Sequence, residues 1–420
     1  MRIRSRQGAA WLVVVAGMSM GCGAQPPAVG PSAPKAPPLD WRTLEAGVLS
    51  DHVQLTRRDQ FTKAGEAYFS PDGSWIVFQA VPVPKAGSDP EPFYSMYVAK
   101  LTRDAAGRIN GTETPILISP PGSANTCGWF HPTRAGVVLF GSTIEAPKTD
   151  QKGGFQVGQR KYVWLFPEET EVCERFVPEI GGATAAGLWA DDRRVSMVMP
   201  LFSRPEYDAE CSYSADGRFV LYAHVRPKKT AERADADIWV YDTRTGRHHA
   251  IVVADGYDGG PFFSPDGKRI CYRSDRKLND QLQLFVADLK FDGEGVPVGI
   301  EREYQITDNT AVNWAPFFHP SGKFLVYGTS QVSHQNYEVF AIELDEAKLA
   351  ADGPVRKVSA ALNGARITSA DGADVLPVFD AKGEWMMWTG QRGPIAEGEQ
   401  RSSSQLWVAR FNAAGVAWGK

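Results

Sequence analysis

Polar side chains recur at one position of an internal repeat, and their types suit ligand binding. From the first repeat to the last, the residues at this position are Ala64, Asn125, Asp208, Asp258, Asn313 and Asp374. Two further carboxylates, Glu66 and Glu210, stand two residues later in the first and third repeats. Carboxylate and amide oxygens would bind Ca²⁺ or Mg²⁺, a basic peptide or a polyhydroxylated ligand.

The same residue types also have a structural explanation, and the sequence leaves both open. Asp and Asn side chains cap turns and tolerate unusual backbone angles, and every repeat needs the same turn. A residue repeated for its turn also makes a repeated ring, so the two roles are compatible. We therefore expect no cofactor, with Ca²⁺ or Mg²⁺ at this ring as the alternative.

Other polar residues favour structural roles. His131 and His319 replace a serine before the turn in two repeats, on opposite sides of the expected ring, which disfavours a shared metal ion. Arg276 and Arg392 follow second strands, and we expect them to pair with acids between blades. The sequence contains no nucleophile elbow, zincin helix, phosphate loop or dinucleotide fingerprint, which argues against the common hydrolases.

A repeated phrase positions all of these residues. Tyr-Phe-Ser-Pro-Asp-Gly or a close variant occurs at residues 68–73, 129–134, 212–217, 262–267, 317–322 and 378–383. Proline presets φ, aspartate bonds back within the turn, and glycine takes the left-handed conformation. Six copies of one unit indicate a repeat architecture.

Short strands with period-2 alternation follow each copy. In the fourth repeat we expect strands at residues 261–264, 269–273, 283–287 and 303–307. Third strands of the other repeats are expected at residues 96–101, 162–166, 238–242, 337–344 and 406–411. Four antiparallel strands in each of six units predict an all-β fold, the six-bladed β-propeller.

The last repeat lacks a fourth strand of its own. Residues 52–56 resemble the fourth strand at 303–307, so we expect this N-terminal strand to complete the last blade and close the ring. The repeat spacing is uneven, which places long insertions at residues 81–92, 144–160 and 181–207. Loops of this kind on a rigid scaffold commonly carry recognition.

The N-terminus has the features of an export signal. Three arginines precede an apolar stretch at residues 8–20, which is too short for a membrane-spanning helix. Because the stretch ends at Gly21-Cys22, it resembles a bacterial lipoprotein signal with Cys22 as the lipidated residue. An ordinary secretory signal is the alternative, and both export the protein. We expect residues 1–22 to be the signal, 23–45 a Pro/Ala/Gly-rich tether and 46–415 the propeller.

Charge and cysteine content narrow the possible partners. The full chain has 45 Lys and Arg against 49 Asp and Glu. Removal of the signal, which holds three of the arginines, makes the net charge about −7 and disfavours nucleic-acid binding. Cys127 and Cys211 fall on inner strands of neighbouring blades and could form a disulfide, but we expect the four cysteines after Cys22 to be buried and unpaired.

The repeated phrases resemble the propeller repeat of TolB, the periplasmic component of the Tol–Pal envelope system, over about residues 50–412. The phrases at residues 207–210 and 257–261 also resemble exported TolB-like proteins of unassigned role. TolB has a separate α/β domain ahead of its propeller, whereas only the tether and a few residues precede the first repeat here. The resemblance therefore implies the fold and the compartment, and it does not carry over a Tol–Pal role.

These observations favour a non-catalytic, monomeric, lipid-anchored propeller that faces the periplasm and binds a protein. Gly23 after Cys22 is not the aspartate of inner-membrane retention, so the outer membrane is preferred. The expected partner is an envelope protein or a peptidoglycan-associated one, bound at the channel mouth and the long loops. The expected contacts are Glu66, Asn125, Asp208, Glu210, Asp258, Asn313 and Asp374.

One alternative is a cation-assisted polysaccharide lyase or hydrolase at the same mouth, with His224 and His334 as further candidate site residues. Another is a structural module of a larger envelope complex.

Overall fold

The computed structural model describes residues 40–148, 154–156, 161–163, 167–181, 197–226, 235–349, 355–357, 362 and 364–419. The expected signal peptide, Cys22 and residues 23–39 of the expected tether lie outside these ranges. The first element is helix α1 (Trp41–Glu45), whose last residue is buried against the propeller. Among the described residues, no helix combines the length and the apolar character that a membrane crossing requires.

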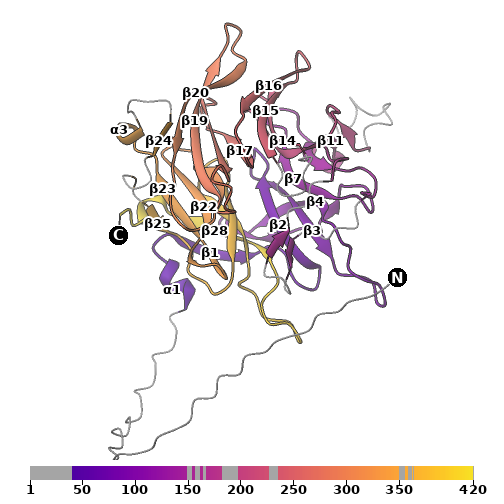
Figure 1. Ribbon diagram of the computed structural model, residues 1–420. Coiled ribbons are helices and arrows are strands. Elements are labelled where there is room, and N and C mark those ends of the chain that lie inside the picture. The colour runs from indigo at the N-terminus through magenta and orange to yellow at the C-terminus, as the bar shows by residue number, and fades with distance from the viewer. Residues whose placement is uncertain are drawn as a thin grey trace, which may run out of the picture. The chain divides into compact units, whose positions relative to one another are not determined.

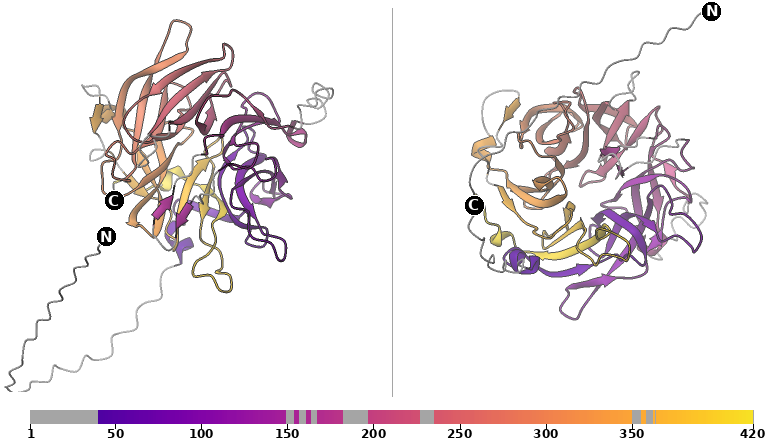
Figure 2. Two further views of the ribbon diagram at one scale, coloured as in Figure 1. Left: turned by 45° about the vertical axis from the view of Figure 1, so that its right-hand side comes forward. Right: turned by 60° about the horizontal axis from the view of Figure 1, so that its bottom comes forward.

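Six sheets of predominantly antiparallel strands surround one axis and confirm the predicted six-bladed propeller (Figures 1 and 2). Blade 1 contains β2 (Phe61–Phe69), β3 (Trp75–Pro82), β4 (Ser95–Arg103), β5 (Ile109–Thr112) and β6 (Ile116–Leu117). Blade 2 contains β7 (Asn125–Phe130), β8 (Val137–Ser142), β11 (Glu171–Phe176) and β12 (Met199–Pro200). Blade 3 contains β13 (Tyr207–Tyr213), β14 (Phe219–Arg226), β15 (Asp235–Asp242) and β16 (Arg247–Val252).

The second half of the chain builds the other three blades. Blade 4 contains β17 (Asp258–Phe263), β18 (Arg269–Ser274), β19 (Gln283–Phe291), β20 (Pro297–Gln305) and β24 (Val355–Lys357). Blade 5 contains β21 (Asn313–Phe318), β22 (Phe324–Ser333), β23 (Asn336–Glu343) and β25 (Gly364–Arg366). Blade 6 contains β26 (Asp374–Phe379), β27 (Trp385–Gly390), β28 (Gln405–Phe411) and β1 (Leu49–Gln54). Short elements outside the blades are β9 (Gly154–Gln156), β10 (Lys161–Val163), α3 (Glu346–Leu349) and the 3-10 helix η3 (Ala413–Gly415).

The N-terminal strand closes the ring, as predicted. β1 pairs antiparallel with β28, from Leu49 opposite Phe411 to Gln54 opposite Trp407. The Thr56 hydroxyl accepts a hydrogen bond from the backbone N–H of Leu406 at 2.9 Å. Thr307 accepts the equivalent bond in blade 4, also at 2.9 Å. The closing segment therefore makes the bonds of an ordinary fourth strand, although it comes from the other end of the chain.

The predicted turns join the inner two strands of each blade. The Ser70 hydroxyl donates to Asp72 and accepts from the backbone N–H of Trp75 at 2.9 Å. In blade 2 the Nδ1 atom of His131 takes this role and accepts from two backbone N–H groups. In blade 5 the Nδ1 atom of His319 accepts from the backbone N–H of Ser321 and lies 2.8 Å from the Ser321 hydroxyl. Both histidines thus serve their turns, as expected, and each packs on the turn glycine of the next blade.

The third strand of blade 2 was wrongly predicted at residues 162–166. The structure uses β11 there, which pairs with β8 and buries Val172 and Cys173. Tyr162 lies instead in β10, which pairs only with β9 in a hairpin inserted between β8 and β11. Both segments carry an apolar strand pattern, and pattern alone does not decide which one reaches the blade. The four described cysteines are buried and unpaired, as expected.

Candidate functional site at the channel

The polar residues that begin the inner strands are buried inside their own blades. Asn125 accepts a hydrogen bond from the Ser142 hydroxyl at 2.7 Å, and Asn313 accepts one from Thr329 at 2.9 Å. Asp208 lies 2.7 Å from Nδ1 of His224, its neighbour across the strand pair. These contacts tie the start of each inner strand to the second strand. Ligand binding by these residues stays a prediction.

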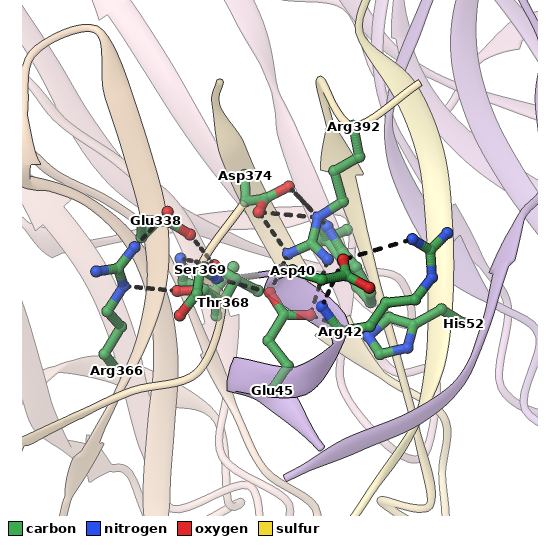
Figure 3. Close-up of polar contacts among 12 residues, drawn as sticks. Asp40, Arg42, Glu45, His52, Glu338, Arg366, Thr368, Ser369, Asp374 and Arg392 are labelled. Carbon is green, nitrogen blue, oxygen red and sulfur yellow. Dashed lines mark hydrogen bonds and ion pairs between the residues drawn. The ribbon is translucent and has the colours of Figure 1, made fainter. Parts of the chain in front are cut away.

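Asp374 belongs to a buried ion network in blade 6 (Figure 3). The Arg392 guanidinium lies 2.6 Å from Asp374 and 2.7 Å from Glu45 of α1. It also lies over the rings of Trp41 and Trp388, within 5 Å of each centroid. Although burial opposes ionisation, hydrogen bonds from His52 and Arg392 lower the pKa of Glu45. The network fastens α1 and the ring-closing segment to the last blade.

Arg276 has the equivalent role in blade 4. Its guanidinium lies 3.3 Å from Asp258 and 2.6 Å from Glu303. Burial raises the pKa of Asp258 to about 7, and the nearby Arg276 opposes that rise. Arg276 and Arg392 therefore pair with acids, as predicted, but the expectation of pairs between blades was wrong. Asp258 and Glu303 both belong to the blade of Arg276 itself.

The residues two places further along each inner strand form a ring around the channel. All six have positive φ, and in each blade the strand pairing shifts register here. A bulge of this kind re-aims a side chain out of the regular pleat. The ring is made of Glu66, Cys127, Glu210, Gly260, Ala315 and Leu376. Glu66 and Glu210 were predicted from the sequence, and all six members line one cavity of about 20 Å³.

Blades 1 to 4 make the polar side of this ring. The Cys127 thiol donates to Oε1 of Glu66 at 2.9 Å. Glu210 accepts from the Tyr257 hydroxyl at 2.6 Å and lies 3.1 Å from the Arg273 guanidinium. Burial raises the pKa of Glu66. The ring thus holds one carboxylate beside a thiol and one beside a guanidinium.

Gly260 leaves room for Arg273 at its place in the ring. Its φ is +59°, and a Cβ there would overlap the Arg273 guanidinium. Arg273, from β18, therefore occupies the space that a ring side chain of blade 4 would fill. Cys127, Tyr257 and Arg273 were not predicted as site residues. The sequence does contain one signal of Arg273. Gly260 stands where two other repeats have glutamate, and a glycine there leaves room for a side chain from another strand.

An aromatic cluster closes the channel beyond the ring. Tyr68, Trp129, Phe262 and Phe317 stand two residues after the ring positions of blades 1, 2, 4 and 5. The rings of Tyr68 and Phe262 lie 5.7 Å apart, although their blades face each other across the axis. Phe262 and Phe317 lie 5.2 Å apart. Contact between opposite blades means that these side chains fill the axis.

No metal site is evident in the part of the chain that the structure describes, where no three His, Cys, Asp or Glu side chains converge on one point. The two ring carboxylates are accompanied by Cys127 and Arg273, and a cationic guanidinium disfavours a divalent ion beside it. The expected Ca²⁺ or Mg²⁺ alternative therefore stays a hypothesis.

No protein-family model matches the chain. Dipeptidyl-peptidase 5 of Porphyromonas gingivalis is 36% identical over 111 residues, which are 25% of this chain and 16% of the peptidase. The chain thus matches about a sixth of that relative's length.

Solved structures with a similar arrangement include a putative TolB from Agrobacterium tumefaciens. It has a TM-score of 0.45 and 14% identity, and the match covers 83% of this chain and 90% of that one. An oligogalacturonate lyase from Vibrio parahaemolyticus has a TM-score of 0.43 and 10% identity, with 86% and 93% covered. The six turn repeats and the closure by an N-terminal strand make this chain a six-bladed β-propeller.

Proposed function

We propose that this protein is an exported, lipid-anchored propeller that binds an envelope protein partner or a peptidoglycan-associated one. The proposed binding surface is the mouth face, which we define as the end of the propeller where the six inner strands begin. The channel ring lies near this end, and the described connections between the second and third strands of blades 1, 4, 5 and 6 lie at the same end. The protein acts as a monomeric binding or scaffold module.

Exposed apolar side chains on the mouth face carry this proposal. Val83, Leu278 and Ile395 lie in the connections between the second and third strands of blades 1, 4 and 6, and Val332 lies near the end of β22. Val253 directly follows β16 at the same end and is 64% exposed. Apolar groups that surround a polar opening are typical of a protein-binding surface.

Capture from envelope extract tests the mouth face directly. Residues 40–420 would be compared with a triple variant, Val253→Ser, Leu278→Ser and Ile395→Ser. Phe291→Ser is the matched control, because Phe291 is 40% exposed but lies at the opposite end of β19. We expect one protein to be retained by the wild type and the control and lost by the triple variant. Equal retention by all three would refute the surface.

The aspartates at the inner-strand starts are unsuitable for this test. Asp258 and Asp374 are buried beside arginines, so their replacement would disturb the blades as well as any ligand contact. Loop residues on the surface avoid that ambiguity.

The lipid anchor is a separate part of the proposal. Cys22 would carry the lipid, and residues 23–39 would connect it to α1, which begins at Trp41. Growth with a radioactive fatty acid should label the full chain, and Cys22→Ser should remove the label. An unlabelled wild type would contradict lipidation and leave only export.

A second candidate function is a cation-assisted enzyme at the same face. The observation in its favour is the contact of His224 with the buried Asp208 through Nδ1, while Nε2 lies 3.4 Å from the partly exposed Glu206. A buried carboxylate on one ring nitrogen is the usual way to orient a histidine for proton transfer. This candidate predicts turnover of a polysaccharide that His224→Gln and a chelator both abolish.

A further inference from the structure

Glu66 differs from the other acids around the channel in the kind of partner it has. Asp258, Asp374 and Glu210 each lie beside an arginine. The hydrogen bonds to the Glu66 carboxylate come from neutral donors, the Cys127 thiol at 2.9 Å and the Tyr68 hydroxyl at 3.3 Å. Arg273 acts on Glu66 only at longer range, because its own ion pair is with Glu210.

The space beside Glu66 is polar on one side and apolar on the other. Glu66, Tyr68, Phe262, Ala315 and Leu376 line both the 20 Å³ cavity and a second cavity of about 10 Å³. Glu210 and Arg273 line the larger cavity as well, but they form an ion pair with each other and so leave the Glu66 charge uncompensated. A volume of about 20 Å³ admits one water-sized group, such as an ammonium head. Glu66 lies deep inside the propeller, yet its side chain is partly accessible to solvent. The accessible part of its surface therefore faces the channel.

These features fit the end of a lysine side chain. The ammonium group of lysine is a compact cation that pairs well with a carboxylate that has no other ion-pair partner. The methylene stem of the lysine side chain packs on apolar surface. Aromatic faces also attract a cation, and the Tyr68 and Trp129 rings lie 4.9 Å apart beneath the ring of channel residues. Because the aromatic cluster fills the axis, such a side chain can enter only from the mouth face.

We propose that Glu66 is the channel site for a lysine ammonium group of the protein partner, with Ala315 and Leu376 packing on its stem. This inference rests on the proposed function, because it names the chemistry of the partner bound at the mouth face. It predicts that the partner presents a protruding lysine flanked by apolar residues.

The site can be tested without the partner by using n-butylammonium, which reproduces the end of a lysine side chain. Binding to residues 40–420 would be followed through the indole ¹H–¹⁵N signal of Trp129, assigned with Trp129→Phe. We expect saturable binding, and affinity at least about tenfold weaker in Glu66→Gln, as for a lost charge-assisted hydrogen bond. Glu113→Gln removes an exposed carboxylate of the same blade and should change nothing.

Three results would overturn the inference. The first is no binding of n-butylammonium to the wild type, and the second is equal affinity in Glu66→Gln. The third is a signal change with n-butanol as large as that with n-butylammonium, because the uncharged probe lacks the ammonium group. A response to CaCl₂ alone that requires Glu66, with none to n-butylammonium, would mark a metal site instead.

Partner capture separates failure of this inference from failure of the proposed function. If the mouth-face triple variant loses the captured protein while Glu66→Gln keeps it, the surface is correct and the lysine site is wrong. If all variants behave as the wild type does, the proposed function itself fails. Melting temperatures of Glu66→Gln and the wild type should agree, because a glutamine carbonyl can still accept from Cys127.

Discussion

Asp374 and Arg392 form a buried ion pair across a spacing of 18 residues. Asp258 and Arg276 repeat both the spacing and the pair in blade 4. In blade 3 the same spacing leads from Asp208 to Arg226, but His224 contacts the aspartate and Arg226 pairs with Asp237. The two asparagine-bearing repeats have Thr143 and Gln331 at that place. In blades 4 and 6 the arginine 18 residues after the inner-strand carboxylate compensates its buried charge, whereas in blade 3 His224 contacts the carboxylate instead.

Removal of one partner of this pair should unfold the protein more easily. We expect Asp374→Ala to lower the free energy of unfolding by about 3–5 kcal/mol, because it leaves Arg392 buried beside a single carboxylate, Glu45. Urea denaturation measures the change. Glu113→Ala breaks an exposed pair with Lys100 and should cost under about 1 kcal/mol. A similar small loss for Asp374→Ala would mean that water reaches the network.

The architecture was predictable because each turn phrase encodes its own conformation locally. The ring closure was predictable too, since residues 52–56 carry the pattern of a fourth strand. The burial of Asp208, Asp258 and Asp374 was not, because an aspartate that binds a ligand and one that binds an arginine have the same sequence pattern. The 18-residue spacing is visible in the sequence, but its meaning depends on strand pairing across the blade.

The channel ring shows a second limit of the sequence. Glu66 and Glu210 can be recognised in the sequence as candidate site residues because they are carboxylates. Ala315 and Leu376 occupy equivalent positions, but their residue types do not indicate a site. A bulge aims all of them at the axis, and a bulge depends on pairing between strands rather than on the residue type. Arg273 reaches the ring from a second strand, so a search confined to inner strands misses it.

Gly260 and Gly267 allow a controlled test of the ring geometry. Both have positive φ, but a Cβ on Gly267 would meet no neighbouring atom within 4 Å, whereas one on Gly260 would overlap Arg273. Gly267→Ala should therefore cost only backbone strain of about 1–2 kcal/mol. Gly260→Ala should cost about 1–3 kcal/mol more, because Arg273 must leave Glu210. Equal unfolding free energies of the two variants would contradict the close packing of Arg273 on Gly260.

Thr56 and Thr307 test whether the closing strand behaves as a fourth strand. Each hydroxyl accepts from a buried backbone N–H of a third strand. Thr56→Val and Thr307→Val should each cost about 1–3 kcal/mol, the penalty for an unsatisfied buried donor. Urea denaturation of both variants checks the equivalence. A much smaller effect of Thr56→Val would show that the ring junction opens before the rest of the propeller unfolds.

His131 should make the propeller sensitive to acid. Burial, assisted by Arg134, lowers the pKa of His131 from 6.5 to about 4. Only the neutral imidazole can accept the two turn N–H groups at Nδ1, so the unfolded chain takes up a proton before the folded one does. The contribution of His131 to stability is therefore complete above pH of about 6.5 and is lost as the pH falls towards 4.

Serine at this position provides the comparison, because Ser70 makes the same turn with a hydroxyl that does not titrate. We expect the unfolding free energy of His131→Ser to fall less steeply between pH of about 6.5 and 4 than that of the wild type. The slope should shrink without vanishing, because His248 and His319 also have lowered pKa values. Slopes are compared rather than absolute stabilities, since the smaller side chain also loses packing against Tyr213. Parallel pH profiles would show that the turn tolerates a protonated His131.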